Sequence, residues 1–241
     1  CRIESNVISN NDWDGIYLGH SSNNIIKNNS ISNNDWYGIW LWESSNNVVS
    51  NNDISNNVVG IVLDDSSNNQ ISNNTFIKDG ILIWNSYKNI IEGNTVNGKP
   101  LVYLEGKTNV KIEDAGQVIL VNCSDIEVKR LNLSNTDISI ELWNSENCRI
   151  ESNVISNGIV FWHSSNNIIT NNSISNNEWD GIWLGRSSNN IIKNNSISNN
   201  DWGGIWLEHS SNNTITSNSI PNNGNGIYLW HSSNNTIKNN S

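Results

Sequence analysis

Apolar residues recur along this chain in short pieces that are separated by Asn, Ser, Asp and Gly. The pieces follow one pattern, Gly-Ile-x-Leu, Ser-Ser-Asn-Asn, Ile-x-Asn-Asn and Ile-Ser-Asn-Asn, which returns about eleven times in steps of roughly 17 to 23 residues. Each piece has the length and the period of two that are typical of a β-strand, and the Asn and Gly between them favour tight turns. The repeat therefore predicts a parallel β-helix with three short strands in each coil. Its equivalent positions are Gly15, Gly38, Gly60, Gly80, Pro100, Gln117, Ser139, Gly158, Gly181, Gly204 and Gly226.

Two other solenoid folds fit the sequence less well. A leucine-rich repeat has a similar length but needs helical or long convex segments, and this chain has a single Ala and almost no run of helix-forming residues. A left-handed β-helix has strict six-residue subrepeats, whereas these coils differ in length. The sequence therefore predicts an all-β, right-handed parallel β-helix.

Two positions of the repeat that usually carry Asn carry apolar residues in the middle of the chain. Apolar replacement indicates that both positions face the interior, so we predict two buried Asn ladders in which each amide bonds to its neighbour one coil away. The first ladder contains Asn24, Asn47 and Asn69 and is interrupted by Val110, Ile126 and Cys148, and the second contains Asn29, Asn52 and Asn74 and is interrupted by Ala115 and Leu131.

The repeat continues without a linker or a change of composition, so we expect residues 1–241 to form a single β-helix domain. The shortest step, from Pro100 to Gln117, is too short for a third strand. The chain has no Met, and it begins and ends within a coil. Because solenoids normally carry polar end caps, we expect it to be a piece of a larger protein.

Charge and composition exclude several classes of partner. The net charge is −10, which argues against nucleic acids and anionic membranes. No apolar run approaches the length of a membrane span. The three cysteines show no disulfide pattern, and we expect Cys1 and Cys148 to be small buried side chains in the first ladder. We expect no cofactor.

Aromatic residues form two files on the outward face of the Gly-Ile-x-Leu strands. Rings that follow one another along a rigid face suit stacking on sugar rings. We therefore predict a glycan-binding surface, with Trp183 and Trp206, and Trp40 and Trp42, as its best platforms. Its residues are Tyr17, Trp40, Trp42, Trp183, Trp206, Tyr228 and Trp230, and the files continue through Trp84, Tyr103, Trp143 and Trp162. For Trp13, Trp36, Trp179 and Trp202, in an Asp/Glu-Trp-x-Gly turn, we expect a turn-covering role.

Two sets of polar residues are weaker candidates for chemistry. His209 and His231 lie on adjacent coils beside Glu208, and two imidazoles with one carboxylate can hold zinc or copper. A chance stacking of His in a polar slot of the repeat explains the same pattern. For acid and base catalysis the candidates are Asp64, Asp65 and Glu43, with Glu105 and Glu141 on the same broad face. Any acidic solenoid yields such pairs, and no coil adds an orienting Arg.

The repeat resembles the pectate-lyase-like right-handed β-helices of carbohydrate-binding proteins and sugar hydrolases. The stretch NGKPLVYLEGKTNVKIEDAGQVILVNCSDIEVKRLNLSNTD, residues 97–137, is similar to the NosD-like branch that is found among archaeal surface proteins. This resemblance implies an exported protein, and NosD proteins themselves are periplasmic factors for copper-site assembly. Copper handling transfers poorly to a chain with no Met, three Cys and four His.

The sequence leaves three functions open. We favour a non-catalytic, extracellular module that binds a polysaccharide or cell-surface glycan, or that packs against neighbouring subunits of a surface layer. The alternatives are a polysaccharide lyase or glycoside hydrolase that uses Asp64 and its neighbours, and a copper-handling protein of the NosD kind. Near-identical coils, such as residues 1–10 and 148–157, favour the non-catalytic role, because an active site needs one coil to differ.

Overall fold

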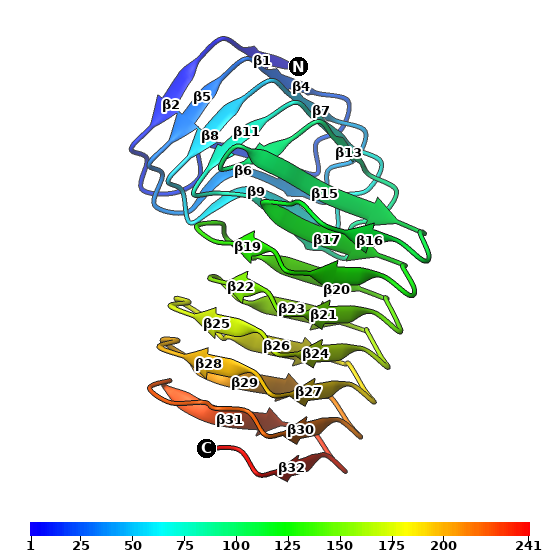
Figure 1. The fold of residues 1–241 in the computed structure, drawn as a ribbon. Coiled ribbons are helices and arrows are strands. Elements are labelled where there is room, and N and C mark those ends of the chain that lie inside the picture. Colours follow the sequence, from blue (N-terminus) through cyan, green and yellow to red (C-terminus); the bar gives the residue numbers. More distant parts are fainter. The chain divides into compact units, whose positions relative to one another are not determined.

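The computed structural model describes all of residues 1–241 and consists of strands and turns without a helix. The chain forms two compact units, which are described separately (Figure 1). Unit 1 contains Cys1–Tyr103 together with Asn135–Asp137, and unit 2 contains Leu104–Ser134 and Ile138–Ser241. The expectation of one continuous domain stays a prediction.

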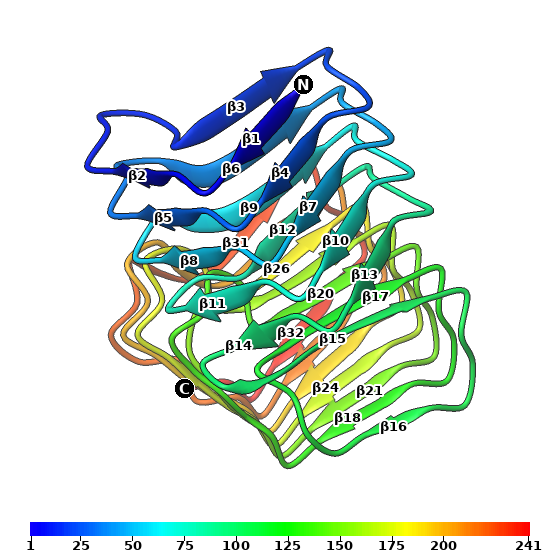
Figure 2. The same cartoon turned by 90° about the horizontal axis from the view of Figure 1, so that it is seen from above.

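Unit 1 is a parallel β-helix with three sheets, each built from one strand of every coil. The first sheet contains β1 (Arg2–Glu4), β4 (Ile25–Lys27), β7 (Val48–Ser50), β10 (Gln70–Ser72) and β13 (Ile90–Glu92). The second contains β2 (Val7–Ser9), β5 (Ser30–Ser32), β8 (Asp53–Ser55), β11 (Thr75–Ile77), β14 (Thr95–Val96) and β15 (Lys99–Glu105). The third contains β3 (Ile16–Gly19), β6 (Tyr37–Trp42), β9 (Val59–Asp64) and β12 (Ile81–Trp84). Figure 2 shows β1, β4, β7 and β10 side by side.

Unit 2 repeats this architecture. One sheet contains β16 (Lys111–Ile112), β18 (Glu127–Lys129), β21 (Arg149–Glu151), β24 (Ile168–Thr170), β27 (Ile191–Lys193), β30 (Thr214–Thr216) and β32 (Thr236–Lys238). The Gly-Ile-x-Leu strands are β17 (Gln117–Val121), β20 (Ile140–Trp143), β23 (Ile159–Trp162), β26 (Ile182–Gly185), β29 (Gly203–Glu208) and β31 (Asn225–Trp230). The third sheet contains β19 (Asn132–Leu133), β22 (Val154–Ile155), β25 (Ser173–Ser175) and β28 (Ser196–Ser198).

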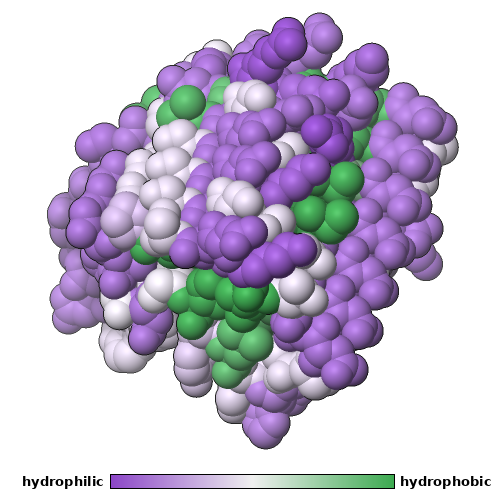
Figure 3. Space-filling view, turned by 60° about the horizontal axis from the view of Figure 1, so that its bottom comes forward, coloured by the Kyte–Doolittle hydropathy of each residue, from purple (hydrophilic) through white to green (hydrophobic).

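The core of each unit is a set of aliphatic columns that run from coil to coil. Ile16 pairs in register with Ile39, and Ile39 pairs with Ile61, so equivalent residues stack directly. Ile39 and Ile61 are fully buried. Hydrophilic residues cover most of the face in Figure 3, and apolar residues form only small clusters on it. The three sheets of each unit confirm the predicted coil of three short strands.

The Asn-Asn pairs of the repeat divide two tasks between their members. The first Asn turns the chain: Asn28 and Asn51, for example, have φ angles of 54° and 55°, in the left-handed region that Asn tolerates better than most residues. The second Asn points inward, and Asn29 and Asn52 are buried. This division explains why the pattern needs Asn twice.

Both predicted Asn ladders are present. In the second, the side-chain amide of Asn29 donates to Oδ1 of Asn52 at 2.9 Å, and Asn52 donates to Oδ1 of Asn74 at 2.9 Å. In the first, the backbone N–H of Asn47 donates to Oδ1 of Asn69 at 2.8 Å. The apolar replacements Ala115, Ile126, Leu131 and Cys148 are buried as expected, whereas Val110 is half-buried and Cys1 is exposed.

Two further ladders went unpredicted. A third Asn ladder links Asn11 to Asn34 and Asn34 to Asn57, with amide bonds of 2.7 and 2.8 Å. A Ser ladder runs through the Ser-Ser-Asn-Asn turns, where the backbone N–H of each coil donates to the hydroxyl of the next. Its bonds join Ser21 to Ser44, Ser44 to Ser66 and Ser66 to Ser86 in unit 1, and Cys123 to Ser145, Ser145 to Ser164, Ser164 to Ser187, Ser187 to Ser210 and Ser210 to Ser232 in unit 2.

The repeat is interrupted at residues 95–117. β14 pairs with β15 in antiparallel fashion through a two-residue turn, Asn97-Gly98, whose φ angles are 50° and 79°. Two successive residues with positive φ define the turn for which Asn-Gly is the preferred sequence. No strand lies between β16 and β17, which confirms the short coil expected after Pro100.

The third Asn ladder ends in unit 1 at a buried carboxyl group. The side-chain amide of Asn57 donates to Asp79 at 2.7 Å, and Asp79 is fully buried. Nearby, Asp137 accepts the backbone N–H groups of Gly60 and Gly80 at 2.8 and 2.7 Å. Burial raises the pKa of Asp79 from 3.8 to about 7, although the bonds from Asn57 oppose the shift.

The ladder makes a stability prediction for Asn52→Ala. The change leaves the backbone N–H of Asn29 and the carbonyl of Ile26 without their partner in the interior. We expect unfolding free energy to fall by roughly 2–4 kcal/mol in urea titrations, because each buried unsatisfied group costs about 1–3 kcal/mol. The exposed neighbour Asp53 provides the control, and equal losses for Asp53→Ala and Asn52→Ala would contradict the ladder's role.

Asp79 predicts a pH dependence of stability. Its folded-state pKa lies above the unfolded value, so its favourable contribution is complete below about pH 4 and is lost as pH rises through about 7. Asp79→Asn replaces the carboxyl group with the amide that the ladder carries elsewhere. When pH rises from 4 to 8, we expect the unfolding free energy of this variant to fall by roughly 2–4 kcal/mol less than that of the parent. Urea titrations across this range test the prediction, with Asp53→Asn as control. Parallel pH profiles for the Asp79 variant and the parent would overturn it.

Candidate functional site

The outward face of the third sheet of unit 1 carries two columns of side chains. Strand register places Trp40 on β6 between Tyr17 on β3 and Val62 on β9, and Leu82 on β12 continues this column. The second column contains Gly19, Trp42, Asp64 and Trp84. The first column therefore changes from aromatic to aliphatic side chains at β9, and in the second column Asp64 on β9 lies between Trp42 and Trp84.

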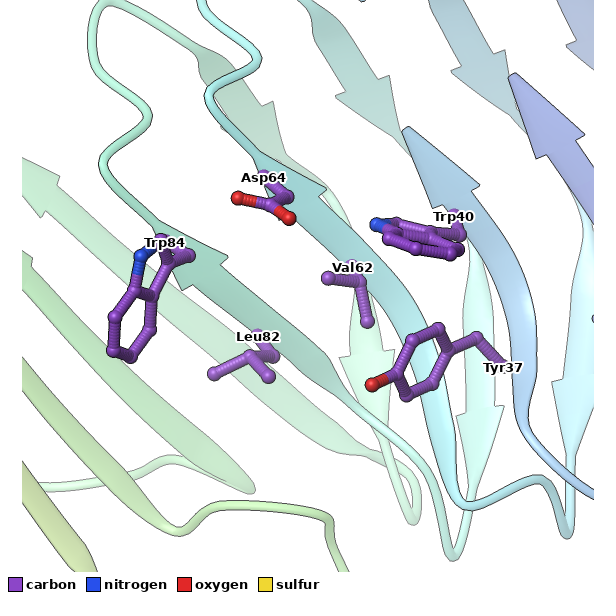
Figure 4. A pocket seen from close by; sticks show the side chains of 6 residues that line it. All are labelled: Tyr37, Trp40, Val62, Asp64, Leu82 and Trp84. Carbon is purple, nitrogen blue, oxygen red and sulfur yellow. The ribbon is translucent and has the colours of Figure 1, made fainter. Parts of the chain in front are cut away.

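The change from aromatic to smaller side chains opens a groove. Val62 and Leu82 form its floor, and the rings of Trp40, Trp84 and Tyr37 surround them (Figure 4). Asp64, which lies on β9 like Val62, completes the lining. The groove measures about 200 Å³ and is open to solvent. Tyr37 stands edge-on to Trp40, with ring centroids 5.6 Å apart. This contact fixes one aromatic wall.

Asp64 is the charged group of the groove lining. Partial burial raises its pKa, and the neighbouring carboxylates of Asp65 and Glu43 raise it further. Burial, with the charges of Asp14 and Asp64, also raises the pKa of Tyr37. The electrostatic environment is therefore acidic, and it holds Tyr37 in its neutral form.

The other two candidate acids lie at the corner that follows the strands. Glu43 and Asp65 have φ angles of 46° and 47°, so the backbone turns there. Glu43 pairs with His20 at 3.0 Å, and Asp65 accepts a hydrogen bond from the amide of Asn85. The three predicted acids are thus neighbours, but only Asp64 lines the groove. Their catalytic role stays a prediction.

The aromatic file of unit 2 packs on itself. The rings of Trp183 and Trp206 stack with centroids 5.1 Å apart and planes 11° apart, and Tyr228 follows Trp206 at 6.2 Å. Each ring therefore covers a face of the next. Tyr228 and Trp230 are exposed, as predicted. In unit 1, Tyr17 packs on Trp40 at 4.9 Å and Trp42 packs on His20 at 4.5 Å.

Two residues expected on the outward face are buried, which corrects the sequence interpretation. Trp143 is 1% exposed and Glu141 is 0% exposed, and the indole N–H of Trp143 donates to the Glu141 carboxylate at 3.3 Å. Alternation along a strand decides which sheet face a side chain takes, but it does not decide whether that face is covered. Neither residue is available for a surface site.

The four turn tryptophans are exposed and pair along the series, and their turn-covering role stays a prediction. Trp13 and Trp179 are 67% and 63% exposed, and they stack on the next tryptophan of the series. The pairs are Trp13 with Trp36, at 5.4 Å, and Trp179 with Trp202, at 6.0 Å. Trp13 is the most exposed aromatic side chain of unit 1, and Trp179 is the most exposed of unit 2.

His209 and His231 meet as the sequence suggested, but their geometry does not suit a shared metal ion. Their rings stack 4.9 Å apart with planes 4° apart. A metal bound by an imidazole nitrogen lies in the ring plane, and one ion cannot lie in two parallel planes. Glu208 forms no metal-binding group with them, and no other three His, Cys, Asp or Glu side chains are placed so that they could hold a metal ion.

The chain matches the models of two protein families. Residues 1–115 match the model described as "Right handed beta helix region", which confirms the predicted hand and the fold class. Residues 79–241 match the model described as "Periplasmic copper-binding protein (NosD)". This match covers more than half of the chain, and the chain belongs to the NosD family. No curated protein matches it, and it has no helix long and apolar enough to cross a membrane.

Solved structures show more distant similarity. A double mutant of the periplasmic alginate epimerase AlgG is 14% identical, with 100% of this chain and 72% of that chain covered and a TM-score of 0.48. The Dettilon tailspike protein is 18% identical, with coverages of 99% and 54% and a TM-score of 0.43. A thermostable alpha-1,3-glucanase from Streptomyces thermodiastaticus is 14% identical, with coverages of 95% and 50% and a TM-score of 0.38. Identities of this size give no guide to substrate or mechanism.

The donor groups of this chain do not fit a copper ion. Copper(I) prefers thiolate and thioether ligands, and the chain has no Met. Cys123 and Cys148 are buried and donate to backbone carbonyls. Burial raises the pKa of both thiols, that of Cys148 to about 11, so both are held as thiols. Together with the stacked imidazoles, this leaves no set of convergent soft ligands within either unit.

The cysteines make a direct prediction about thiol reactivity. We expect one thiol, that of the exposed Cys1, to react with an aromatic disulfide reagent in the folded protein, and all three to react in denaturant. The buried thiols should resist because reagents need an accessible thiolate. Cys1→Ser removes the fast reaction. Rapid labelling of two or more thiols in the folded chain would show that Cys123 or Cys148 is accessible.

Proposed function

We propose that this protein is an exported, non-catalytic β-helix module that binds a glycan in the groove of unit 1. The observation that carries the proposal is the groove itself, with an aliphatic floor, aromatic walls and one carboxylate. Sugar rings present apolar C–H faces and polar edges. Aromatic side chains stack on the former, and carboxylates bond to the hydroxyl groups of the latter.

The groove is open to solvent, so its aromatic walls are accessible to a ligand. Trp40 contributes its ring face to the wall, while its indole N–H is buried. Among the other predicted platforms, Trp42 belongs to the same sheet of unit 1, whereas Trp183, Trp206, Tyr228 and Trp230 form a separate aromatic file in unit 2. A role in a cell-surface layer is compatible with this binding.

The non-catalytic role rests on the arrangement of the acids. Glycoside hydrolysis needs two carboxyl groups that reach one bond from different sides. Here Glu43 and Asp65 are engaged with His20 and Asn85, which leaves Asp64 as the carboxyl group of the groove. The raised pKa of Asp64 favours one alternative, in which it acts as a general acid in a polysaccharide-acting enzyme.

The family supports the proposed export, because its description names a periplasmic protein. An exported location would place the groove where polysaccharides are found. Export should be tested with the complete gene product.

The proposal predicts that the groove retains polysaccharides. We expect the purified chain to be retarded in gels that contain a suitable polymer, and Trp40→Ala to weaken this binding about tenfold or more, because one aromatic–sugar contact contributes roughly 1–3 kcal/mol. Trp13→Ala is the matched control, since it removes a tryptophan of the same unit that lies outside the groove.

A second variant tests the groove without removing an aromatic ring. Val62→Trp continues the column of Tyr17 and Trp40 and should fill the groove, much as Trp206 covers Trp183. It should abolish binding and keep the fold. Soluble products released from the polymer, and lost in Asp64→Asn, would establish the enzymatic alternative instead. Binding that survives both Val62→Trp and Trp40→Ala would place the contact elsewhere.

A further inference from the structure

The charges around the groove have one sign. Asp64 is the charged residue of its lining, and the carboxylates of Asp65 and Glu43 lie close enough to raise its pKa. Asp14 approaches from the coil before and accepts the backbone N–H of Tyr37 at 3.0 Å. The basic group of this region is His20, which is paired with Glu43.

The acidity belongs to this groove and is not imposed by the repeat. The corner that holds Glu43 and Asp65 recurs in unit 2 with the same backbone, as φ angles of 47° to 52° show. There it carries two amides, Asn122 and Asn144, and the basic side chains His163, Arg186, His209 and His231, whereas in unit 1 His20 and Asn85 share it with Glu43 and Asp65. Because the corner accepts neutral, acidic and basic side chains, the repeat does not require the two carboxylates beside the groove.

A carboxylate beside aromatic faces favours a cation. Asp64 can form a charge-assisted hydrogen bond with an ammonium group, and the rings of Trp40, Trp84 and Tyr37 attract a cation through their π-faces. A uronic acid would place its carboxylate among three others and be repelled. A neutral sugar would gain the stacking contacts but not the ion pair.

We propose that the groove binds a glycan of amino sugars that carry free, protonated amines, and that it discriminates against polyuronates. The inference rests on the proposed function and specifies its ligand class. The aromatic walls hold the ring and Asp64 holds the ammonium group, so the chain selects its polymer by charge as well as by shape.

Three oligosaccharides of equal length test the inference by isothermal titration calorimetry with the full chain. They are a glucosamine hexamer, its N-acetylated counterpart and a galacturonate hexamer, at a pH where the amines are largely protonated. We expect the glucosamine hexamer to bind about tenfold or more tightly than the N-acetylated one, which matches one charge-assisted bond. We expect no binding of the galacturonate hexamer.

Asp64→Asn should remove the preference by bringing the glucosamine hexamer to the affinity of the N-acetylated hexamer. Asp53→Asn changes the net charge equally at an exposed site outside the groove and should leave the preference intact. This control separates the ion pair from the general attraction of cations to a chain with a net charge of −10. Urea titrations confirm that each variant is folded.

The outcomes separate this inference from the proposed function. Equal binding of the charged and acetylated hexamers, or preferred binding of the galacturonate hexamer, with either lost in Val62→Trp, would keep a glycan-binding groove and overturn the amino-sugar specificity. A preference that persists in Asp64→Asn would also overturn it. If Val62→Trp changes the binding of none of the three, both proposals fail.

Discussion

The buried side-chain amide is the interaction on which the fold depends. A coil of about 20 residues must turn three times around a narrow interior, and each turn brings backbone N–H and C=O groups out of reach of water. The amide of Asn52 accepts from the backbone and side chain of Asn29 and donates to the carbonyl of Ile26 and to Asn74. One side chain thereby satisfies several groups whose burial would each cost about 1–3 kcal/mol. The residue before it supplies the left-handed corner, which makes the Asn-Asn pair a structural unit.

Because the ladders hold the backbone, the outward positions are free to vary. Trp40, Val62 and Leu82 occupy one column and differ greatly in size, yet their strands keep the same register. A groove can then arise by substitution alone, where large side chains give way to small ones. Its shape is set by the neighbours that remain large. This separation of scaffold from surface allows a nearly uniform repeat to carry a local site.

The sequence predicts the scaffold better than the site, for a physical reason. Apolar residues such as Ala115 and Leu131 mark an interior position, so the two ladders they interrupt could be recognised. The Ser ladder and the third Asn ladder are not marked by an aliphatic replacement and look like ordinary turns. The groove could not be predicted from the sequence, because its floor is formed by Val62 and Leu82, and aliphatic residues at these positions do not indicate a binding site. Trp143 and Glu141 show the same limit. Alternation along a strand predicts which face of the sheet a side chain is on, but not whether other side chains bury that face.

The family description names copper binding, whereas the residues of this chain do not form a copper site. The division between inward and outward residues explains this difference. The NosD family match covers residues 79–241, a range built mainly of repeated coils. Copper binding would instead require convergent soft ligands. Here the thiols of Cys123 and Cys148 are buried in ladder slots, and the imidazoles of His209 and His231 stack face to face. A scaffold can be inherited while the outward columns change independently. The corner after the strands illustrates this, because the same backbone carries two carboxylates in unit 1, basic side chains at four places in unit 2, and amides in both. Ligand choice in this protein is therefore decided by a few outward residues on a repeat whose inward residues decide the fold.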